Sequence, residues 1–128
     1  MERIKGDLFT TKYTEVFHED ESQIKYNAPH HFKVLKSGKE LNDRYQVMEN
    51  LITEIDFQEG PIKECGVNGV ANEDLIAMVI TRLEHYQKSE FACRENALAI
   101  TKLEEAMLWL KKRTMGREQR GVEGTHIK

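Results

Sequence analysis

The 128-residue sequence is poor in residues that break helices, cross-link the chain or mark a membrane segment. It has two prolines and two cysteines, and it lacks the run of about 18 apolar residues that a membrane-spanning helix needs. Its formal net charge is −3, whereas proteins that bind nucleic-acid backbones usually carry a basic face. These absences predict a soluble protein that neither crosses a membrane nor binds polymeric nucleic acid.

Cysteine usage bears on the cellular compartment. Cys65 and Cys93 lie far apart and no signal peptide precedes them, which favours a reduced cytosolic protein over a disulfide-linked one. We expect structural thiols, with Cys93 facing the core and inert.

The helix-breaking residues divide the chain into two unlike parts. Both prolines and most glycines fall in residues 1–71, whereas residues 72–119 contain one glycine, Gly116. This distribution predicts a β-rich region with a glycine-rich loop over 1–71, and a helical hairpin with a tail over 72–128. We expect the two parts to form one compact α+β domain.

Two segments of the first part alternate as half-buried strands do. HFKVL (residues 31–35) places Phe32 and Val34 on one face, and LITEIDF (51–57) alternates in the same way. Turn-prone residues join them, which predicts a small antiparallel meander. Residues 8–17 form a possible further strand, and 18–23 resemble an exposed acidic loop.

The second part has the periodicity of two helices. Asn72 is a suitable N-cap for the first helix and Ser89 for the second. The first helix has an apolar stripe formed by Leu75, Ile76, Val79, Leu83 and Tyr86. The second has a heptad seam formed by Asn96, Ile100, Leu103, Met107, Leu110 and Thr114. These patterns predict a long antiparallel hairpin whose second helix packs against another copy, making the protein a homo-oligomer.

Three arginines share one face at the end of the second predicted helix. Arg113, Arg117 and Arg120 follow the i, i+4, i+7 spacing, and a guanidinium suits phosphate or carboxylate groups. A solvated basic helix end that complements the helix dipole is the alternative, and neighbouring Lys111 and Lys112 favour it.

The tail after these arginines points toward a ligand. Gly121 and Gly124 would let backbone amides approach an anion closely. Thr125 and His126 add polar side chains. The tail is therefore a candidate cover over a bound phosphate.

A second candidate anion site is the glycine-rich segment 59–70. Such loops before a helix N-terminus often bind anions through backbone amides, although a structural turn explains this segment equally well. It matches neither a Walker loop nor a dinucleotide fingerprint. Its candidate residues are Gly60, Pro61, Lys63, Asn68 and Gly69.

Three residues near the turn of the predicted hairpin suit a nucleotide. Asn96 offers a donor and an acceptor to a base or ribose, or alternatively it specifies the register of an oligomer. Tyr86 and Phe91 could stack on a base, or alternatively pack in the core.

Enzyme and metal signatures are lacking. His30 and His31 should point to opposite faces of a strand, and no His/Cys spacing resembles a metal site. The sequence therefore predicts no catalytic residues, no metal and no cofactor.

The order of several segments gives a resemblance. GPIKE, GVNG, NEDL, ENALA, WLKKRT and RGVEGTH occur in sequence within residues 55–128. In these segments the chain resembles the helical-hairpin sponges that phages use against nucleotide-signalled immunity. Within that group it is most similar to the Thoeris anti-defence proteins of the first class and to the shorter anti-CBASS sponges.

The resemblance implies a fold and a function. It implies a β part followed by two helices, assembled as a homodimer and a hexamer. It implies binding of cyclised ADP-ribose signals made by TIR enzymes, such as glycocyclic ADP-ribose, in the cytoplasm of an infected bacterium, without cleavage. Signal binding would involve Tyr86, Asn96, Arg113 and Arg117. The further candidates from the same segments are Phe91, Thr114, Arg120, Gly124 and Thr125.

Helix geometry adds a constraint to this resemblance. Asn96 and Arg113 are 17 positions apart, which corresponds to ~25 Å along a straight helix. One small signal can touch both only if the two residues come from different chains. Two-fold symmetry would then give two sites per dimer.

The expected function is a signal sponge that is not an enzyme. The alternatives are a sponge for cyclic di- or trinucleotides, directed against CBASS, and an oligomerisation or host-interaction module without a ligand. An enzyme that degrades the signal is a third alternative.

Overall fold

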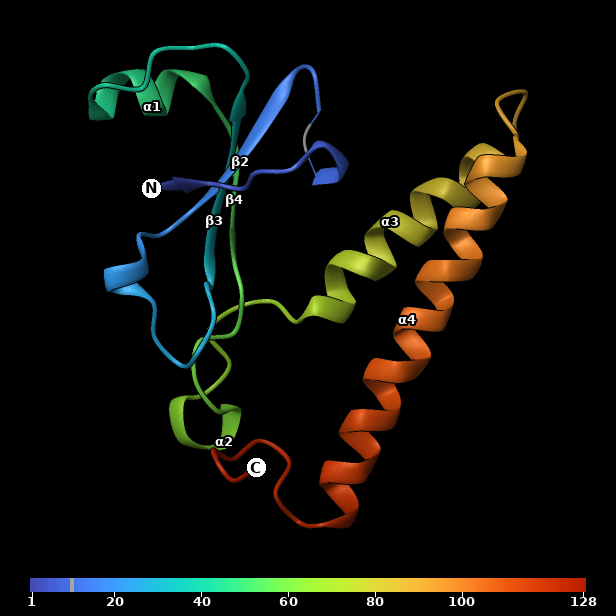
Figure 1. The fold of residues 1–128 in the computed structure, drawn as a ribbon. Helices are drawn as coiled ribbons and strands as arrows, with labels where there is room; N and C mark the ends of the chain where they lie inside the picture. Colours follow the sequence, from blue (N-terminus) through green and yellow to red (C-terminus); the bar gives the residue numbers. More distant parts are fainter. Residues whose placement is uncertain (10) are drawn as a thin grey trace. The chain divides into compact units, whose positions relative to one another are not determined.

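The computed structural model describes residues 1–9 and 11–128. They form two units: Met1–Gly60 with Val67–Gly69, and Pro61–Gly66 with Val70–Lys128. The first contains a small antiparallel sheet and the second a long helical hairpin (Figure 1). This confirms the predicted α+β class. The glycine-rich segment is divided between the two units.

The sheet is a four-stranded antiparallel meander in chain order, as the alternation predicted. Its strands are β1 (Glu2–Arg3), β2 (Thr14–His18), β3 (His31–Lys36) and β4 (Leu51–Asp56). The strand suggested over residues 8–17 is confined to β2, and Thr10 lies outside the described residues. Two short 3-10 turns, η1 (Asp7–Phe9) and η2 (Glu21–Gln23), flank β2.

Phe32 lies at the centre of the apolar cluster on this sheet. Its ring makes edge-to-face contacts with His18 at 5.9 Å and with Phe57 at 5.4 Å, measured between ring centroids. The buried side chain of β3, however, is Leu35, which has no exposed area. The pairing of β3 with β4 shifts register between Val34 and Leu35. The residue skipped by this shift, Ile52, lies in β4, so alternation within β3 is regular and Leu35 lies on the face opposite Phe32 and Val34. The sequence pattern placed the apolar face at Phe32 and Val34 and therefore did not predict the burial of Leu35.

A short helix, α1 (Arg44–Asn50), replaces part of the turn region expected between the two strands. The Asp43 carboxylate accepts the Gln46 N–H at 2.8 Å, and the Gln46 side chain accepts the Asn42 N–H at 2.6 Å. These two bonds satisfy donors that a helix start leaves free. The sequence analysis missed α1 because turn-prone residues are also good helix caps.

The predicted hairpin is present, formed by α3 (Asn72–Gln87) and α4 (Arg94–Gln119). Both predicted caps were wrong. Ala71 is the N-cap of α3, where the Asp74 carboxylate accepts its N–H at 2.8 Å, and Cys93 is the N-cap of α4. Asn72 is therefore the first helical residue.

The turn between the two helices has its own hydrogen bonds. The Ser89 hydroxyl donates to the Tyr86 carbonyl and accepts from the Phe91 N–H, so Ser89 stabilises the turn instead of capping α4. Gln87 bonds both backbone groups of Cys93, each at 2.9 Å. Cys93 is exposed, whereas we expected it to face the core.

The heptad seam of α4 is its less exposed face. All six seam residues, from Asn96 to Thr114, are half-buried. On α3 the predicted stripe was partly wrong, because Val79 and Tyr86 are exposed and Ile80 is half-buried.

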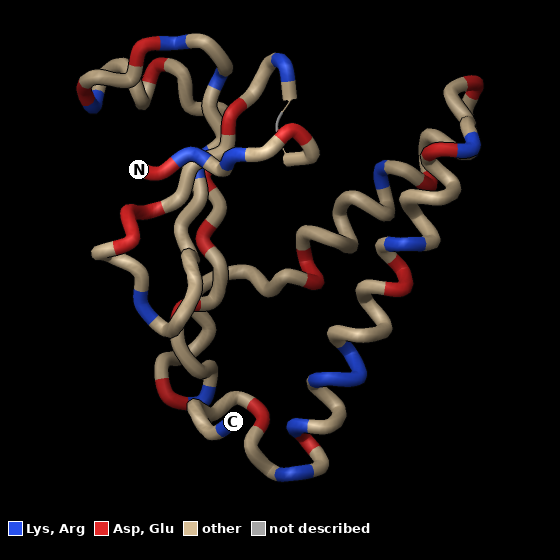
Figure 2. Tube along the Cα trace, in the orientation of Figure 1, with Lys and Arg blue, Asp and Glu red and all other residues tan. Residues whose placement is uncertain are grey.

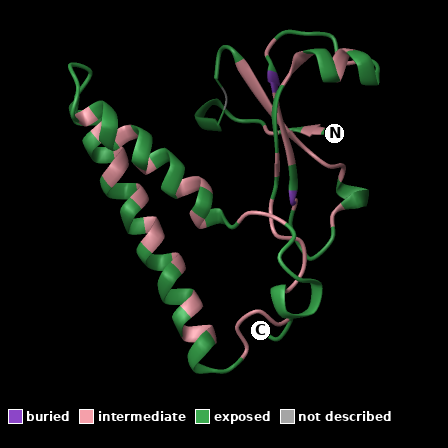
Figure 3. Cartoon of the chain, turned by 180° about the vertical axis from the view of Figure 1, so that it is seen from behind, coloured by how far each residue is buried: buried purple, intermediate pink, exposed green. Residues whose placement is uncertain are grey.

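Neither helix contains a buried residue (Figure 3). Leu108 is 69% exposed and Trp109 is 62% exposed, so the hairpin leaves much apolar surface uncovered. Within the described residues, no helix is both long enough and apolar enough to cross a membrane.

Two glycines allow a matched test of the fold. A Cβ at Gly69 would lie 2.4 Å from the Phe57 carbonyl carbon, whereas a Cβ at Gly116 would meet nothing within 4 Å. We expect Gly69→Ala to destabilise the protein by about 1–3 kcal/mol through backbone displacement. Gly116→Ala should stabilise α4 by about 0.5–1 kcal/mol. Urea unfolding followed by circular dichroism measures both, and equal stability of the two variants would contradict the close packing at Gly69.

Candidate functional site

The C-terminal end of α4 has a Schellman cap that turns the chain into the tail. Gly121 has φ +72°, a value that L side chains rarely adopt. The Val122 N–H donates to the Arg117 carbonyl and the Gly121 N–H to the Glu118 carbonyl, both at 3.0 Å. This pair of bonds defines the cap. The helix ends just before Arg120, so Arg120 follows the spacing of the other two arginines but is not itself a helical residue.

Arg117 holds the tail. Its Nη2 donates to the carbonyls of Val122, Thr125 and Ile127 at 2.9–3.1 Å. The Arg120 Nη1 donates to the Lys128 backbone oxygen at 2.7 Å. Two of the three aligned guanidinium groups therefore bind the chain's own carbonyl oxygens, instead of forming the open cationic face expected from spacing.

The tail is also bonded to the short helix α2 (Ile62–Cys65). The Lys63 N–H donates to the Gly124 carbonyl at 2.9 Å, and the Glu64 carboxylate contacts the His126 N–H and Nδ1, both at 2.9 Å. Gly124 has φ +75°, and a Cβ there would lie 2.9 Å from the Lys63 side chain. The Thr125 hydroxyl donates to the Val122 carbonyl. These contacts give Gly124, Thr125 and His126 structural roles in positioning the tail.

A shallow hollow of about 390 Å³ lies on this end of α4. Within the described part of the chain, Arg113 makes no hydrogen bond or ion pair, and the Lys112 Nζ lies 5.1 Å from the centre of the Trp109 ring. Basic residues gather along the same end of the helix (Figure 2). The hollow is lined by Trp109, Lys112, Arg113, Gly116, Arg117 and Arg120. It combines fixed positive charge with an exposed indole, which suits an anionic ligand that has an aromatic base.

The predicted aromatic pair lies at the other end of the hairpin. Tyr86 and Phe91 line a hollow of about 410 Å³ with Thr81, Arg82, His85 and Ser89. The Arg82 guanidinium lies 5.9 Å from the centre of the Tyr86 ring. This second hollow also pairs an aromatic ring with a cation.

The structure brings the three arginines together but not Asn96 with them. Asn96 and Arg113 lie on the single unbroken helix α4, so the expected separation of ~25 Å within one chain applies. Thr114 is half-buried on the seam, and its hydroxyl donates to the Leu110 carbonyl. Trp109 was not among the sequence-predicted site residues. The sequence did contain a signal for it, because Trp109 lies four positions before Arg113 and therefore on the same face of the helix.

The glycine-rich segment has clear structural contacts. The Asn68 side chain bonds both the N–H and the carbonyl of Glu59 at 2.8 Å. Gly60 has φ +84° and its carbonyl accepts from Gln58. Gly69 packs against the Phe57 backbone.

The helices next to this segment also make structural contacts. Pro61 is the N-cap of α2, and the Lys63 Nζ lies 4.0 Å from the Glu123 carboxylate. The first turn of α3 carries Glu73 and Asp74, and their negative charge opposes anion binding there.

The first unit contains a titratable cluster that no sequence pattern indicated. The His31 ring lies between two carboxylates, with Nδ1 2.8 Å from Asp56 Oδ1 and Nε2 2.9 Å from Glu59 Oε2. The hydrogen bond to Asp56, above all, raises the pKa of His31 above its ordinary value, although partial burial opposes the shift. No local spacing signals this cluster, because its residues become neighbours only through strand pairing.

Glu19 belongs to the same cluster. Burial acts to raise the pKa of this carboxyl, but backbone N–H groups, including those of His30 and His31, lower it below its ordinary value. Glu19 therefore stays ionised beside His31.

The chain is similar to known proteins along its whole length. The Acb2/Tad1 hairpin domain matches residues 49–115, which is more than half of the chain. A protein of Bacillus phage SBSphiJ7 named "Thoeris anti-defense 1" is 52% identical over 142 aligned positions, and the alignment covers 100% of both proteins. These findings confirm the resemblance carried by the segments from GPIKE to RGVEGTH. The chain belongs to the Acb2/Tad1 hairpin family.

Proposed function

We propose that this chain is a phage anti-defence sponge that acts in the cytoplasm of the infected bacterium. It binds a cyclised ADP-ribose signal of the glycocyclic type made by TIR enzymes and holds it without cleavage. The relative named for Thoeris anti-defence supports the biological role. The observation that carries the ligand class is the hollow in which Arg113 and Trp109 lie together on α4.

The lining of this hollow suits a nucleotide with two phosphates. The Arg113 guanidinium can form paired hydrogen bonds with phosphate oxygens, and the exposed Trp109 indole offers a face to adenine. A sponge must bind its signal more tightly than the host sensor does, and nanomolar affinity corresponds to about 12 kcal/mol. Several charge-assisted hydrogen bonds and one stacked base in a pre-formed site together supply a binding free energy of this order.

The lining also favours holding the ligand over cleaving it. Its six residues are four cations, an indole and a glycine. None of these is a carboxylate, imidazole or thiol of the kind that general-base or nucleophilic catalysis uses at neutral pH.

Arg113 and Arg117 have different roles in this proposal. Arg113 is free to contact the ligand, whereas Arg117 already donates to three tail carbonyls. Arg117 therefore positions the tail beside the hollow and reduces the conformational entropy lost when the tail closes over a phosphate.

A second copy of the chain completes the site. Leu108 and Trp109 on α4 leave a large apolar surface uncovered, and burying such surface drives association. Antiparallel packing of two α4 helices would bring Asn96 and Tyr86 of one chain to Arg113 of the other. A homodimer would then hold two equivalent sites, and dimers could assemble further into a hexamer.

A cyclic di- or trinucleotide is the alternative ligand. The hollow at Tyr86, Phe91 and Arg82 favours this alternative, because it offers a further aromatic and cationic surface. The two ligand classes share phosphate and adenine chemistry, so only direct competition separates them.

Capture and release test the sponge mechanism. The protein is incubated with glycocyclic ADP-ribose, separated from free ligand, and heated, and the released compound is analysed by mass spectrometry. Intact signal is expected. Altered signal would indicate an enzyme, and no captured signal would indicate an interaction module. Cyclic di- and trinucleotides are added as competitors in parallel samples.

The cationic hollow is tested by single substitutions. We expect Arg113→Ala to weaken signal binding by about tenfold to a hundredfold, since it removes charge-assisted hydrogen bonds. Arg113→Lys should recover only part of the affinity, because an ammonium lacks the planar fork. Lys111→Ala is the matched control, because Lys111 is a cation on the same helix end that lines a different hollow with Glu73 and Glu104. Calorimetric titration measures all three, and equal affinities of Arg113→Ala and Lys111→Ala would discard the site.

The two-chain site is tested by complementation. Asn96→Ala and Arg113→Ala chains should each bind the signal poorly as homodimers. In a dimer that contains one of each, one site loses both residues and the other keeps both. Co-expression with two different affinity tags isolates the mixed dimer, which should bind one ligand with the affinity of the unsubstituted protein. A mixed dimer that binds as poorly as either parent would contradict a site shared between chains.

A further inference from the structure

Three ionisable residues of the first unit converge at one end of the sheet. Glu19 directly follows β2, His31 begins β3, and Glu59 lies three residues after β4. One atom of each, two carboxylate oxygens and an imidazole nitrogen, lies within 4.8 Å of the others. Antiparallel pairing of β2, β3 and β4 produces this convergence, because the end of β2, the start of β3 and the end of β4 lie at the same end of the sheet.

The orientation of His31 is that of a metal-binding histidine. Nδ1 is 2.8 Å from Asp56 Oδ1, so an N–H on Nδ1 donates to that carboxylate. Nε2 lies 2.9 Å from the Glu59 carboxylate, and a metal ion between the two atoms would replace this hydrogen bond and displace the Nε2 proton. Histidines that bind metals usually donate their second N–H to a carboxylate or a carbonyl, which fixes the ring and its tautomer. Asp56 would have this supporting role.

Glu19 supplies a buried carboxylate oxygen that lacks a donor. Its side chain is only 8% exposed. Oε2 accepts the N–H groups of His30 and His31, both at 3.1 Å, but Oε1 has no hydrogen-bond partner among the described residues. The His18 Nδ1 is 3.9 Å from Oε1 and bonds instead to the Glu19 carbonyl at 2.7 Å. An unsatisfied buried carboxylate oxygen is costly, and a bound cation would remove that cost.

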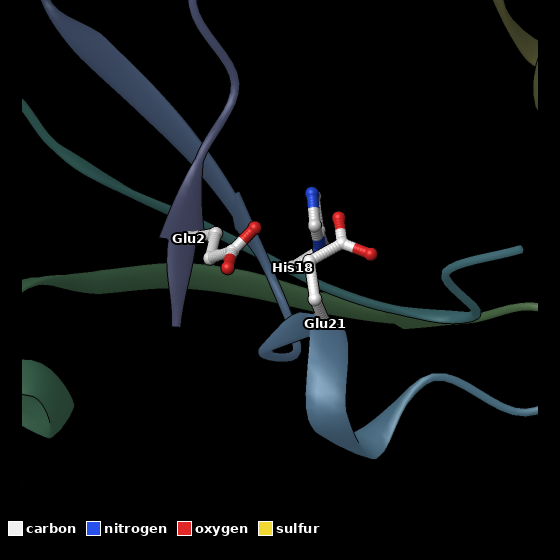
Figure 4. A group of neighbouring side chains, drawn as sticks. All are labelled: Glu2, His18 and Glu21. Carbon is white, nitrogen blue, oxygen red and sulfur yellow. The ribbon is translucent and has the colours of Figure 1, made fainter.

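A neighbouring cluster makes a useful comparison. Glu2, His18 and Glu21 also place three ligand-type atoms within 4.8 Å, and their side chains face one another between β1, β2 and η2 (Figure 4). Glu21 is exposed, and the side chains of this group contain no buried oxygen without a hydrogen bond. The group containing Glu19 is therefore the stronger candidate.

An ion can reach the Glu19 cluster. A cavity of about 180 Å³ is lined in part by Glu19, His31 and Asp56. Glu54 and Lys33 line the same cavity and form an ion pair at 3.6 Å. The cavity is large enough for an ion and its remaining water ligands.

We propose that Glu19, His31 and Glu59 bind one divalent transition-metal ion of the Zn²⁺ class. Two carboxylates and one imidazole are ligands that Zn²⁺ accepts, and Zn²⁺ binds such sites more tightly than Mn²⁺ does. Tetrahedral coordination at ~2.0–2.2 Å requires ligand atoms about 3.3–3.5 Å apart, which small side-chain rotations achieve from the present spacing. Three protein ligands leave a position for water.

The ion would connect the sheet to the glycine-rich loop. Both backbone groups of Glu59 bond to the Asn68 side chain at 2.8 Å. Fixing the Glu59 carboxylate to β2 and β3 through the metal would therefore restrict the loop between Glu59 and Asn68. The cluster shares no residue with either hollow of the hairpin.

Calorimetric titration of Zn²⁺ into untagged, EDTA-treated protein tests the proposal. We expect one Zn²⁺ per chain with a dissociation constant below about 10 μM, and a rise in melting temperature when Zn²⁺ is added. Glu19→Gln keeps an oxygen for the His30 and His31 N–H groups but removes the charge, and Glu59→Gln changes a more exposed ligand. Each should weaken Zn²⁺ binding by at least about tenfold while the circular dichroism spectrum stays unchanged.

Two control substitutions complete the experiment. Glu54→Gln removes a carboxylate from the same cavity and should leave Zn²⁺ binding unchanged. Glu2→Gln should also leave it unchanged. The proposal is overturned if the unsubstituted protein binds no Zn²⁺, or if binding survives Glu19→Gln and Glu59→Gln together. It is equally overturned if Glu2→Gln abolishes binding and Glu59→Gln does not, since the ion would then lie in the neighbouring cluster.

Discussion

The unbroken helix α4 is the constraint on which the interpretation of the hairpin depends. It is one continuous α-helix of 26 residues, so its polar seam residue Asn96 stays distant from Arg113. The same helix leaves Leu108 and Trp109 exposed. In a single chain the residues of the proposed ligand site are therefore separated and apolar surface is uncovered, and the proposed association between chains would resolve both.

The C-terminal tail shows how identical residue types acquire different roles. Arg113 and Arg117 are one helical turn apart, yet Arg117 binds three carbonyls while Arg113 has no bonded partner in the described chain. The difference follows from the Schellman cap, which turns the backbone at Gly121 and brings the tail carbonyls to Arg117. All three arginines line the shallow hollow, but Arg117 and Arg120 also hold the tail, whereas Arg113 does not.

Sequence patterns predicted the long helices and their half-buried face well, but they predicted helix caps and the buried residue of the sheet poorly. One glycine and no proline between 72 and 119 indicated long helices, and the heptad seam identified the half-buried face of α4. The caps at Ala71 and Cys93 were missed, because their backbone N–H groups bond to side chains three residues into the helix or at the end of the preceding helix. The burial of Leu35 was missed because the alternation of β3 indicated the face of Phe32 and Val34, whereas Leu35 is buried on the opposite face.

What the sequence determined by itself is the α+β class, the meander, the hairpin and the clustering of arginines at one helix end. Each depends on residues close together in the chain, where helix and strand periodicities operate. Only the tertiary structure decided that Arg117 binds the tail, that Glu64 binds His126, and that Glu19, His31 and Glu59 converge. The Glu64–His126 contact and the cluster at the sheet join residues far apart in sequence, whereas the Arg117 contacts span 5 to 10 residues and require the chain to reverse after α4. Strand pairing and chain reversal set these partners, and no local pattern records them.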